Sequence, residues 1–154
     1  MIITASIVTY KTDHDELKKC IDSMRKNGIA PIYISDNSPS DELREFCSQL
    51  DGVEYIFNNA NIGYGPGHNV AIKKAQEIHA NYHLVINSDV YFDEGVIAKI
   101  TEYMGYRKVL FDVSNIWIVR WKNHLQCPIL QVCLLPILVL SPLEIGRASC
   151  RERV

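Results

Sequence analysis

The sequence predicts an α/β domain with a mostly parallel sheet and helices on both faces. Two observations lead to this fold class. Strand-like and helix-like segments alternate four times between residues 2 and 104, and residues 2–8 form a nearly continuous β-prone apolar run. Such a run is typical of a strand that is buried on both faces of a parallel sheet. A chain of 154 residues is long enough for one domain with a substantial core.

Local signals place each element in order. Asp13, followed three residues later by Glu16, resembles a capping box that opens the first helix, and Asn27-Gly28 is a helix-ending signal. Ser38-Pro39 predicts the start of the second helix, with proline at its first position. A third helix is expected after the glycine-rich stretch, and a fourth over residues 93–104. The remaining strands are expected at residues 31–35, 53–57 and 82–86. The third helix should bury Val70, Ala71, Ala75 and Ile78.

Composition narrows the functional classes. The net charge of −2 gives no reason to expect nucleic acid as a partner. The five cysteines have no metal-ligand spacing, and an odd number is a poor disulfide framework, so we expect reduced thiols in a cytoplasmic protein. The first ten residues lack the basic region and cleavage site of a signal peptide. The longest apolar stretch, at residues 128–140, is too short and too interrupted to span a bilayer, so no transmembrane segment is expected.

Polar residues follow each of the four predicted strands. Ligands of parallel α/β sheets bind outside the carboxyl ends of the strands, so these positions are the candidate site. Asp36 is either a turn-capping residue or a carboxylate that accepts hydrogen bonds from a ribose or base, with few core contacts of its own. Asn87 and Asp89 either cap the next helix or face one Mg²⁺ or Mn²⁺ ion. The four strand ends are Thr9-Tyr10-Lys11, Asp36-Asn37-Ser38, Asn58-Asn59-Ala60-Asn61 and Asn87-Ser88-Asp89.

Residues 61–69 read N-I-G-Y-G-P-G-H-N. Glycines spaced by two match neither the Walker pattern nor the dinucleotide fingerprint, so the stretch is either a loop that approaches a ligand closely or an ordinary strand-to-helix turn. The five histidines show no metal spacing, since the expected helix ends between His79 and His83. Cys20 and Cys47 lie on or beside apolar helix faces and are expected in the core.

Taken together, the stretches V-T-Y-K, I-S-D-N-S, N-N-A-N-I-G-Y-G-P-G-H-N and L-V-I-N-S-D-V resemble the family 2 glycosyltransferases with the GT-A fold. The resemblance covers residues 2–104 and is nearest to rhamnosyltransferase-like enzymes of bacterial surface polysaccharides. It implies a Rossmann-like GT-A half-domain that binds a nucleotide-sugar donor, for transfer of the sugar to a glycan or lipid-linked acceptor.

The resemblance also implies roles for individual residues. A divalent ion, Mg²⁺ or Mn²⁺, would be faced by Asp89, with Asn87 at the first position of a D-x-D-like site, where the family has Asp. The chain shows no recognisable counterpart of the family's catalytic base. The implied donor-binding residues are Thr9, Tyr10, Asp36, Asn61, Gly63, Gly67 and Asn69.

The composition changes near residue 105. Residues 1–105 carry a net charge of −6, whereas residues 106–154 carry +4. We expect residues 105–154 to be out of frame or vector-derived, which would leave a truncated enzyme. The alternative is a hydrophobic tail for peripheral association with the inner face of the plasma membrane. A non-catalytic nucleotide-sugar-binding remnant is the functional alternative. A phospho-receiver domain is disfavoured, because it needs an acidic cluster where this chain has Thr9-Tyr10-Lys11.

Overall fold

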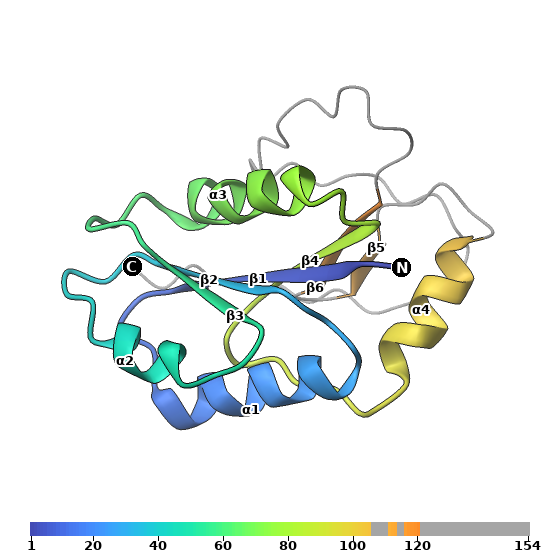
Figure 1. The fold of residues 1–154 in the computed structure, drawn as a ribbon, viewed down its shortest axis with the longest axis horizontal. Coiled ribbons are helices and arrows are strands. Elements are labelled where there is room, and N and C mark those ends of the chain that lie inside the picture. The colour runs from blue at the N-terminus through green and yellow to red at the C-terminus, as the bar shows by residue number, and fades with distance from the viewer. Residues whose placement is uncertain (106–110, 114–115, 121–154) are drawn as a thin grey trace.

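The computed structural model describes residues 1–105, 111–113 and 116–120. As predicted, strands and helices alternate through the first 105 residues, and the sheet lies between helices on both of its faces (Figure 1). The elements are β1 (Ile3–Thr9), α1 (His14–Lys26), β2 (Ile32–Asp36), α2 (Leu43–Ser48), β3 (Val53–Phe57), α3 (Tyr64–Glu77), β4 (Tyr82–Ile86), α4 (Val96–Gly105), β5 (Phe111–Val113) and β6 (Ile116–Arg120).

The sheet has the strand order β3-β2-β1-β4-β6-β5. Strands β1 to β4 are parallel, which confirms the predicted parallel sheet. β6 runs antiparallel to β4, and β5 runs antiparallel to β6; these two strands were not predicted. The register aligns Thr9 with Asp36, and Asp36 with Phe57. The carboxyl ends of the parallel strands therefore lie along one edge of the sheet.

Most of the segment 105–154, including the apolar stretch at residues 128–140, lies outside the described residues. Its predicted origin stays a prediction. In the described part of the chain, no helix is both long enough and apolar enough to cross a bilayer.

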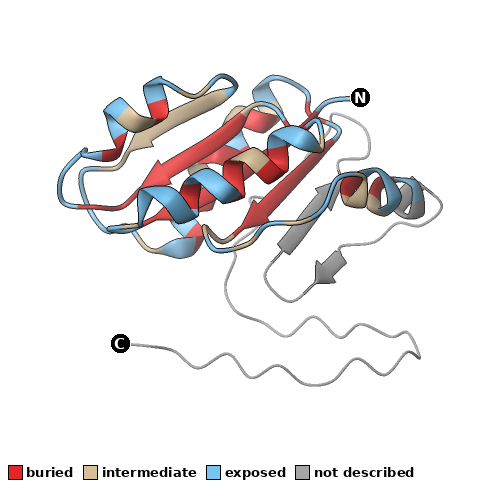
Figure 2. Cartoon of the chain, turned by 90° about the horizontal axis from the view of Figure 1, so that it is seen from below, coloured by how far each residue is buried: buried red, intermediate tan, exposed pale blue. Residues whose placement is uncertain are grey.

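The face of the sheet toward α1 is apolar. Ile3 and Ile7 of β1 belong to one buried cluster with Leu17 and Ile21 of α1, and the cluster also contains Ile97 of α4. Strands β2 and β4 are buried along their whole length, whereas the edge strand β3 is half-buried (Figure 2). Burial of apolar side chains on this face supplies most of the hydrophobic stabilisation of the domain.

The opposite face, under α3, is built from small and polar residues. Tyr33 packs there with Ala71 and Ala75 of α3. The buried polar residues Thr4, Ser6, His68 and His83 form a chain of hydrogen bonds between β1, α3 and β4. The two faces of this sheet thus hold their helices by different means, apolar packing on one and paired polar groups on the other.

Short contacts link these buried polar groups. The Thr4 hydroxyl lies 2.7 Å from Nδ1 of His83 and 3.3 Å from the carbonyl oxygen of Tyr82. The Ser6 hydroxyl lies 2.8 Å from Nε2 of His83 and 2.8 Å from Nδ1 of His68. Each imidazole nitrogen in these contacts donates or accepts according to its tautomer. His68 Nε2 is buried and has no hydrogen-bond partner among the described residues.

Helix α3 begins at Tyr64, so most of the glycine-rich stretch is helical and not a loop. At Gly67, a Cβ atom would lie 2.8 Å from Cγ2 of Val8, which shows how closely α3 approaches β1. Gly63, the N-cap residue, has a φ of 90°, a conformation that glycine adopts without strain. The stretch therefore consists of a short turn over residues 61–63 and the first turns of α3, where Gly67 leaves no room for a larger side chain.

We expect Gly67→Ala to destabilise the protein. Helix propensity alone would favour alanine by about 1 kcal/mol, but overpacking against a branched strand side chain costs about 1–3 kcal/mol. Because Val8 lies in the sheet and cannot swing away, the melting temperature should fall. Removing the two methyl groups in the double variant Val8→Ala/Gly67→Ala should recover part of the loss. A single variant that melts at the wild-type temperature would contradict the close packing of α3.

Three helix predictions were wrong in detail. The fourth helix, α4, begins at Val96 and not at residue 93. The second helix begins at Leu43 and not at Ser38-Pro39, because Ser38 is engaged elsewhere: its Oγ accepts the backbone N–H of Lys11. Two residues expected in the core under α3 are outside it, since Val70 is half-buried and Ile78 is exposed. The buried apolar residues of α3 are Ala71, Ile72 and Ala75.

Candidate nucleotide-sugar site

Asp36 is the best-connected residue of the predicted site. Its Oδ1 accepts the Thr9 hydroxyl at 3.0 Å and the Ser38 N–H at 3.0 Å, and its Oδ2 accepts the Tyr55 hydroxyl at 2.7 Å. Asp36 and Thr9 have no exposed surface. The expectation that Asp36 has few core contacts is therefore wrong, because its carboxylate ties the ends of β1, β2 and β3 together.

Burial and the hydrogen bond to Asp36 raise the pKa of Tyr55 well above its ordinary value. Tyr55 therefore remains a hydrogen-bond donor to the carboxylate throughout the neutral range. The guanidinium of Arg44 lies over the Tyr55 ring, 5.3 Å from its centroid.

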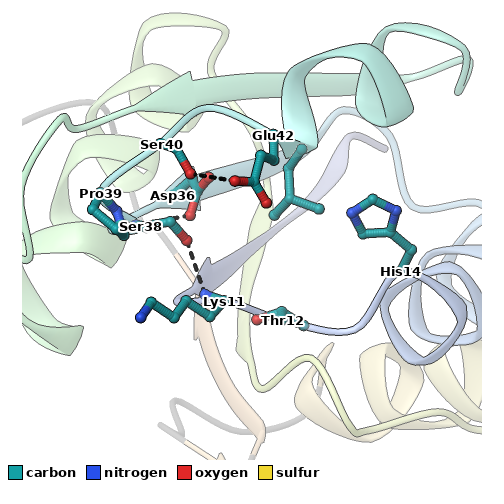
Figure 3. Close-up of a pocket in the computed structure, with 9 residues that line it drawn as sticks. Lys11, Thr12, His14, Asp36, Ser38, Pro39, Ser40 and Glu42 are labelled. Atoms are coloured by element: carbon teal, nitrogen blue, oxygen red, sulfur yellow. Dashed lines mark hydrogen bonds between the residues drawn. The ribbon is translucent and has the colours of Figure 1, made fainter.

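A cavity of about 470 Å³ opens beside Asp36, between the segments that follow β1 and β2 (Figure 3). Of the predicted donor-binding residues, Asp36 alone is on its wall, since Thr9 lies behind it in the core and Tyr10 is half-exposed outside. The cavity is polar and carries charge of both signs. Its walls are Lys11, Thr12 and His14 on one side, and Asp36, Ser38, Pro39, Ser40, Glu42 and Leu43 on the other.

Two charged or aromatic wall residues, His14 and Glu42, were not among the candidate site residues of the sequence, and Lys11 was given no role in donor binding. His14 stacks on Phe46 with 4.9 Å between ring centroids, and Glu42 accepts the Ser40 hydroxyl at 2.8 Å. Lys11 stood in the predicted strand end, but the other two lie at helix starts. Their place at the cavity depends on the approach of α1 and α2 to one edge, which no local pattern reveals.

A group of asparagines joins the ends of β2 and β3 to the start of α3. Asn37 Nδ2 donates to the Gly63 carbonyl at 3.1 Å and to Asn61 Oδ1 at 3.4 Å. Asn58 Nδ2 donates to Asn37 Oδ1 at 2.9 Å. The Gly63 N–H donates to Asn61 Oδ1 at 3.1 Å. Asn37 is therefore the centre of this group, and it holds the predicted donor-binding residues Asn61 and Gly63 next to the β2 end.

Gly67 and Asn69 lie further along α3. Gly67 is buried against β1 and Asn69 is half-buried, with an Oδ1 atom that is enclosed and has no hydrogen-bond partner among the described residues. Neither residue lines the cavity beside Asp36.

Asn87 and Asp89 follow β4 at the same edge of the sheet. Asn87 is half-buried; its Oδ1 accepts the Tyr64 hydroxyl at 2.7 Å, and its backbone oxygen accepts the Cys20 thiol at 3.5 Å. Asp89 is exposed. Thr9, Asp36, Asn61 and Asp89 thus all lie at or just after the carboxyl ends of the parallel strands.

Two oxygen-bearing side chains follow β4, and their chemistry is what a shared metal site would need. Among the described residues, no three His, Cys, Asp or Glu side chains form a closed metal site. Mg²⁺ and Mn²⁺ in nucleotide enzymes are held by one or two side chains together with substrate phosphates. One exposed carboxylate, Asp89, and one amide oxygen, Asn87 Oδ1, match that donor set.

The order of the parallel strands, with helices on both faces and a polar cavity at the carboxyl edge, defines a nucleotide-binding type of α/β domain. A sequence model of the family described as glycosyl transferase family 2 matches residues 4–126. The chain belongs to glycosyl transferase family 2. The match includes β5 and β6 and extends past residue 104, so the likeness reaches beyond the four motifs. The division of the chain at residue 104 stays a prediction.

One curated relative is the low-salt glycan biosynthesis hexosyltransferase Agl10 of Haloferax volcanii, which is 38% identical over 85 residues. That alignment covers 54% of this chain and 26% of the relative, so the chain aligns with about a quarter of the relative's length.

Two solved structures show the same fold. Staphylococcus aureus TarS 1-349 in complex with UDP-GlcNAc aligns with a TM-score of 0.56 and 18% identity, over 69% of this chain and 32% of that one. The mannosyltransferase PcManGT from Pyrobaculum calidifontis, in complex with GDP-Man and Mn²⁺, aligns with a TM-score of 0.58 and 12% identity, over 70% and 33%. The predicted GT-A fold is confirmed.

Proposed function

We propose that this chain binds a nucleotide-sugar donor and serves transfer of its sugar to a glycan or lipid-linked acceptor in bacterial surface polysaccharide synthesis. The observation that carries the proposal is the polar cavity beside Asp36, at the same sheet edge as the exposed carboxylate of Asp89. Family membership supports the reaction class. With a lipid-linked acceptor, the enzyme would work at the cytoplasmic face of the plasma membrane.

The cavity beside Asp36 is proposed for the nucleoside. Lys11, His14 and Glu42 offer charged and aromatic groups to a base and ribose, and half-exposed Tyr10 flanks them. Asp36 and Thr9 support the wall from behind, since both carboxylate oxygens of Asp36 already accept hydrogen bonds from protein groups.

The start of α3 is proposed for the diphosphate. Its N-cap residue, Gly63, has no side chain that could accept the N–H groups of the first turn, and that turn contains no acidic residue. Free N–H groups at a helix N-terminus favour anions. Asn61, Gly63 and Asn69 shape this end, whereas Gly67 acts by letting the helix approach the sheet.

Asp89 and Asn87 are proposed to face a Mg²⁺ or Mn²⁺ ion. A divalent ion at this place neutralises the negative charge that develops on a departing nucleoside diphosphate. The role of Asp89 is electrostatic, since it adds one negative charge at the end of β4. Sugar transfer also requires that the acceptor hydroxyl lose its proton to a base, and no residue of this chain is assigned to that step.

The test is calorimetric titration of nucleotide sugars, with and without Mn²⁺, into wild type and Asp89→Asn. The variant is almost isosteric but lacks the charge beside the dication. We expect the Mn²⁺-dependent gain in donor affinity to fall by at least about tenfold, equivalent to about 1.4 kcal/mol. Metal-free nucleotide binding should stay unchanged, because the cavity lies beside Asp36.

Asp93→Asn is the matched control, because Asp93 is an exposed acid four residues further along. It should bind donor and metal as wild type does. Equal Mn²⁺ dependence in wild type and Asp89→Asn would show that Asp89 only caps a turn. An assay of donor hydrolysis and transfer beside the titration separates an active enzyme from a non-catalytic binding domain.

A further inference from the structure

Asn87 is held from both faces of the sheet. Tyr64 belongs to α3, which covers one face, and Cys20 belongs to α1, which covers the other (Figure 1). The Tyr64 hydroxyl lies 2.7 Å from the side-chain Oδ1 of Asn87, and the Cys20 thiol lies 3.5 Å from its backbone oxygen. The turn after β4 is thus fixed at a main-chain atom and a side-chain atom of the same residue.

Both groups are hydrogen-bond donors to Asn87. The thiol is a weak donor at this distance, whereas the short phenol bond is a strong one. Tyr64 therefore controls the side chain of Asn87.

The Tyr64 ring is itself held in place by a buried side chain. It meets the imidazole of His68 edge to face, with 4.4 Å between ring centroids. His68 is fully buried and is fixed by Ser6 at 2.8 Å. The phenol therefore reaches Asn87 from a support anchored in the core, although Tyr64 itself is 43% exposed.

A carboxamide has two ends of opposite polarity. Rotation by 180° exchanges the acceptor Oδ1 for the donor Nδ2, which would turn a positive N–H group toward a cation. A phenol hydroxyl can also accept from Nδ2, but it is a better donor than acceptor, so its bond to Oδ1 favours one orientation of the amide. It occupies one lone pair of that oxygen and leaves the other for a ligand.

We propose that Tyr64 is a positioning residue: its hydroxyl selects the orientation of the Asn87 amide that presents Oδ1 to the metal ion at the end of β4. This inference rests on the proposed function, and it assigns to Tyr64 a role that the glycine-rich motif did not indicate. In this chain the amide of Asn87 replaces a carboxylate, whose two equal oxygens would need no such selection.

The test is Tyr64→Phe, which removes the hydroxyl and keeps the ring against His68. The Mn²⁺-dependent gain in nucleotide-sugar affinity, measured by calorimetry, should fall by about three- to tenfold, while metal-free binding stays as in wild type. The matched control is Tyr91→Phe, because Tyr91 follows the same turn and is 69% exposed. It should behave as wild type.

A background variant separates orientation from general support. In Asn87→Asp, either oxygen of the side chain can face the ion, so adding Tyr64→Phe should change the Mn²⁺-dependent gain by less than twofold. A loss in the Asn87→Asp background as large as in wild type would overturn the proposal, because the hydroxyl would then act by holding α3 against β4. Equal loss of metal-free binding in Tyr64→Phe would overturn it as well.

The wild-type titration keeps the two proposals apart. If wild type gains no affinity from Mn²⁺, the metal role in the proposed function fails, and the role of Tyr64 fails with it. If wild type gains affinity and Tyr64→Phe gains as much, only the role of Tyr64 is wrong. Thermal melting of each variant shows that it is folded, and Asn87→Asp alone gives the comparison should Tyr64→Phe not fold: its Mn²⁺-dependent gain should equal or exceed that of wild type, and a smaller gain would overturn the proposal.

Discussion

Replacing Asp36 with alanine should lower the free energy of unfolding by about 3–5 kcal/mol, the cost of leaving the partners of a buried charge unpaired. The fully buried Thr9 hydroxyl, the Tyr55 hydroxyl and the Ser38 N–H would all lose their acceptor. Urea unfolding of the two proteins, followed by far-ultraviolet circular dichroism, measures the difference.

Two variants bracket that result. Asp36→Asn keeps the volume and one acceptor oxygen, so it should lose less stability than Asp36→Ala. Asp41 lies between β2 and α2, and its exposed carboxylate pairs with Arg44. Asp41→Ala should leave the urea midpoint unchanged. If Asp36→Ala is as stable as wild type, the three donors find other acceptors. The carboxylate of Asp36 is then not needed for folding, and ligand binding would be its only role.

The protein should lose stability steeply as the pH falls below about 6.5. Burial lowers the pKa of His68 to about 3, and burial together with the neighbouring His68 lowers that of His83 to about 3. In the unfolded chain both imidazoles take up protons near pH 6.5. Between these values the unfolded state binds up to two more protons than the folded state, so stability falls by up to about 2.7 kcal/mol per pH unit.

Urea midpoints between pH 7 and 5 test this, since most carboxylates stay ionised in that window. In His68→Gln, stability should fall less steeply with pH, toward the slope expected when the unfolded state binds one extra proton. His14→Gln, at an exposed position on the cavity wall, should keep the wild-type steepness. A stability that does not change between pH 7 and 5 would show that the imidazoles take up protons over the same pH range in the folded protein as in the unfolded chain.

The elements with local signals were predicted best. Asp13 accepts the N–H groups of Asp15 and Glu16 and so caps α1, which ends at Lys26 before Asn27. Strands β3 and β4 have the predicted bounds, because short apolar runs between polar turns allow little choice.

The failures share a cause, which is dependence on distant residues. Ser38 looked like a helix cap, but its hydroxyl oxygen accepts from Lys11, 27 positions away. Helix α3 begins at Tyr64 and packs closely on Val8 at Gly67, a distant contact that the glycines alone do not reveal. Strand β6 lies in the sheet by antiparallel pairing with β4 and β5, which the preceding alternation of strands and helices does not indicate.

The site was predicted by position more than by contact. The strand-end rule placed Asp36, Asn61 and Asp89 at one edge. It could not show that Asp36 is buried, because that depends on Thr9 and Tyr55 from the neighbouring strands. It also could not identify Asn37 as the centre of the asparagine group, because the sequence around a turn asparagine does not show whether its side chain has hydrogen-bond partners.

The unlike faces of the sheet set unequal limits on how this sequence can vary. Under α1, one aliphatic residue can replace another of similar volume at small cost, because apolar contact has no direction. Under α3, each hydroxyl and imidazole needs a partner of matching kind, and Gly67 leaves no room for a methyl group. The face under α1 should therefore tolerate more substitutions than the face under α3, and Tyr64 belongs to the less tolerant face.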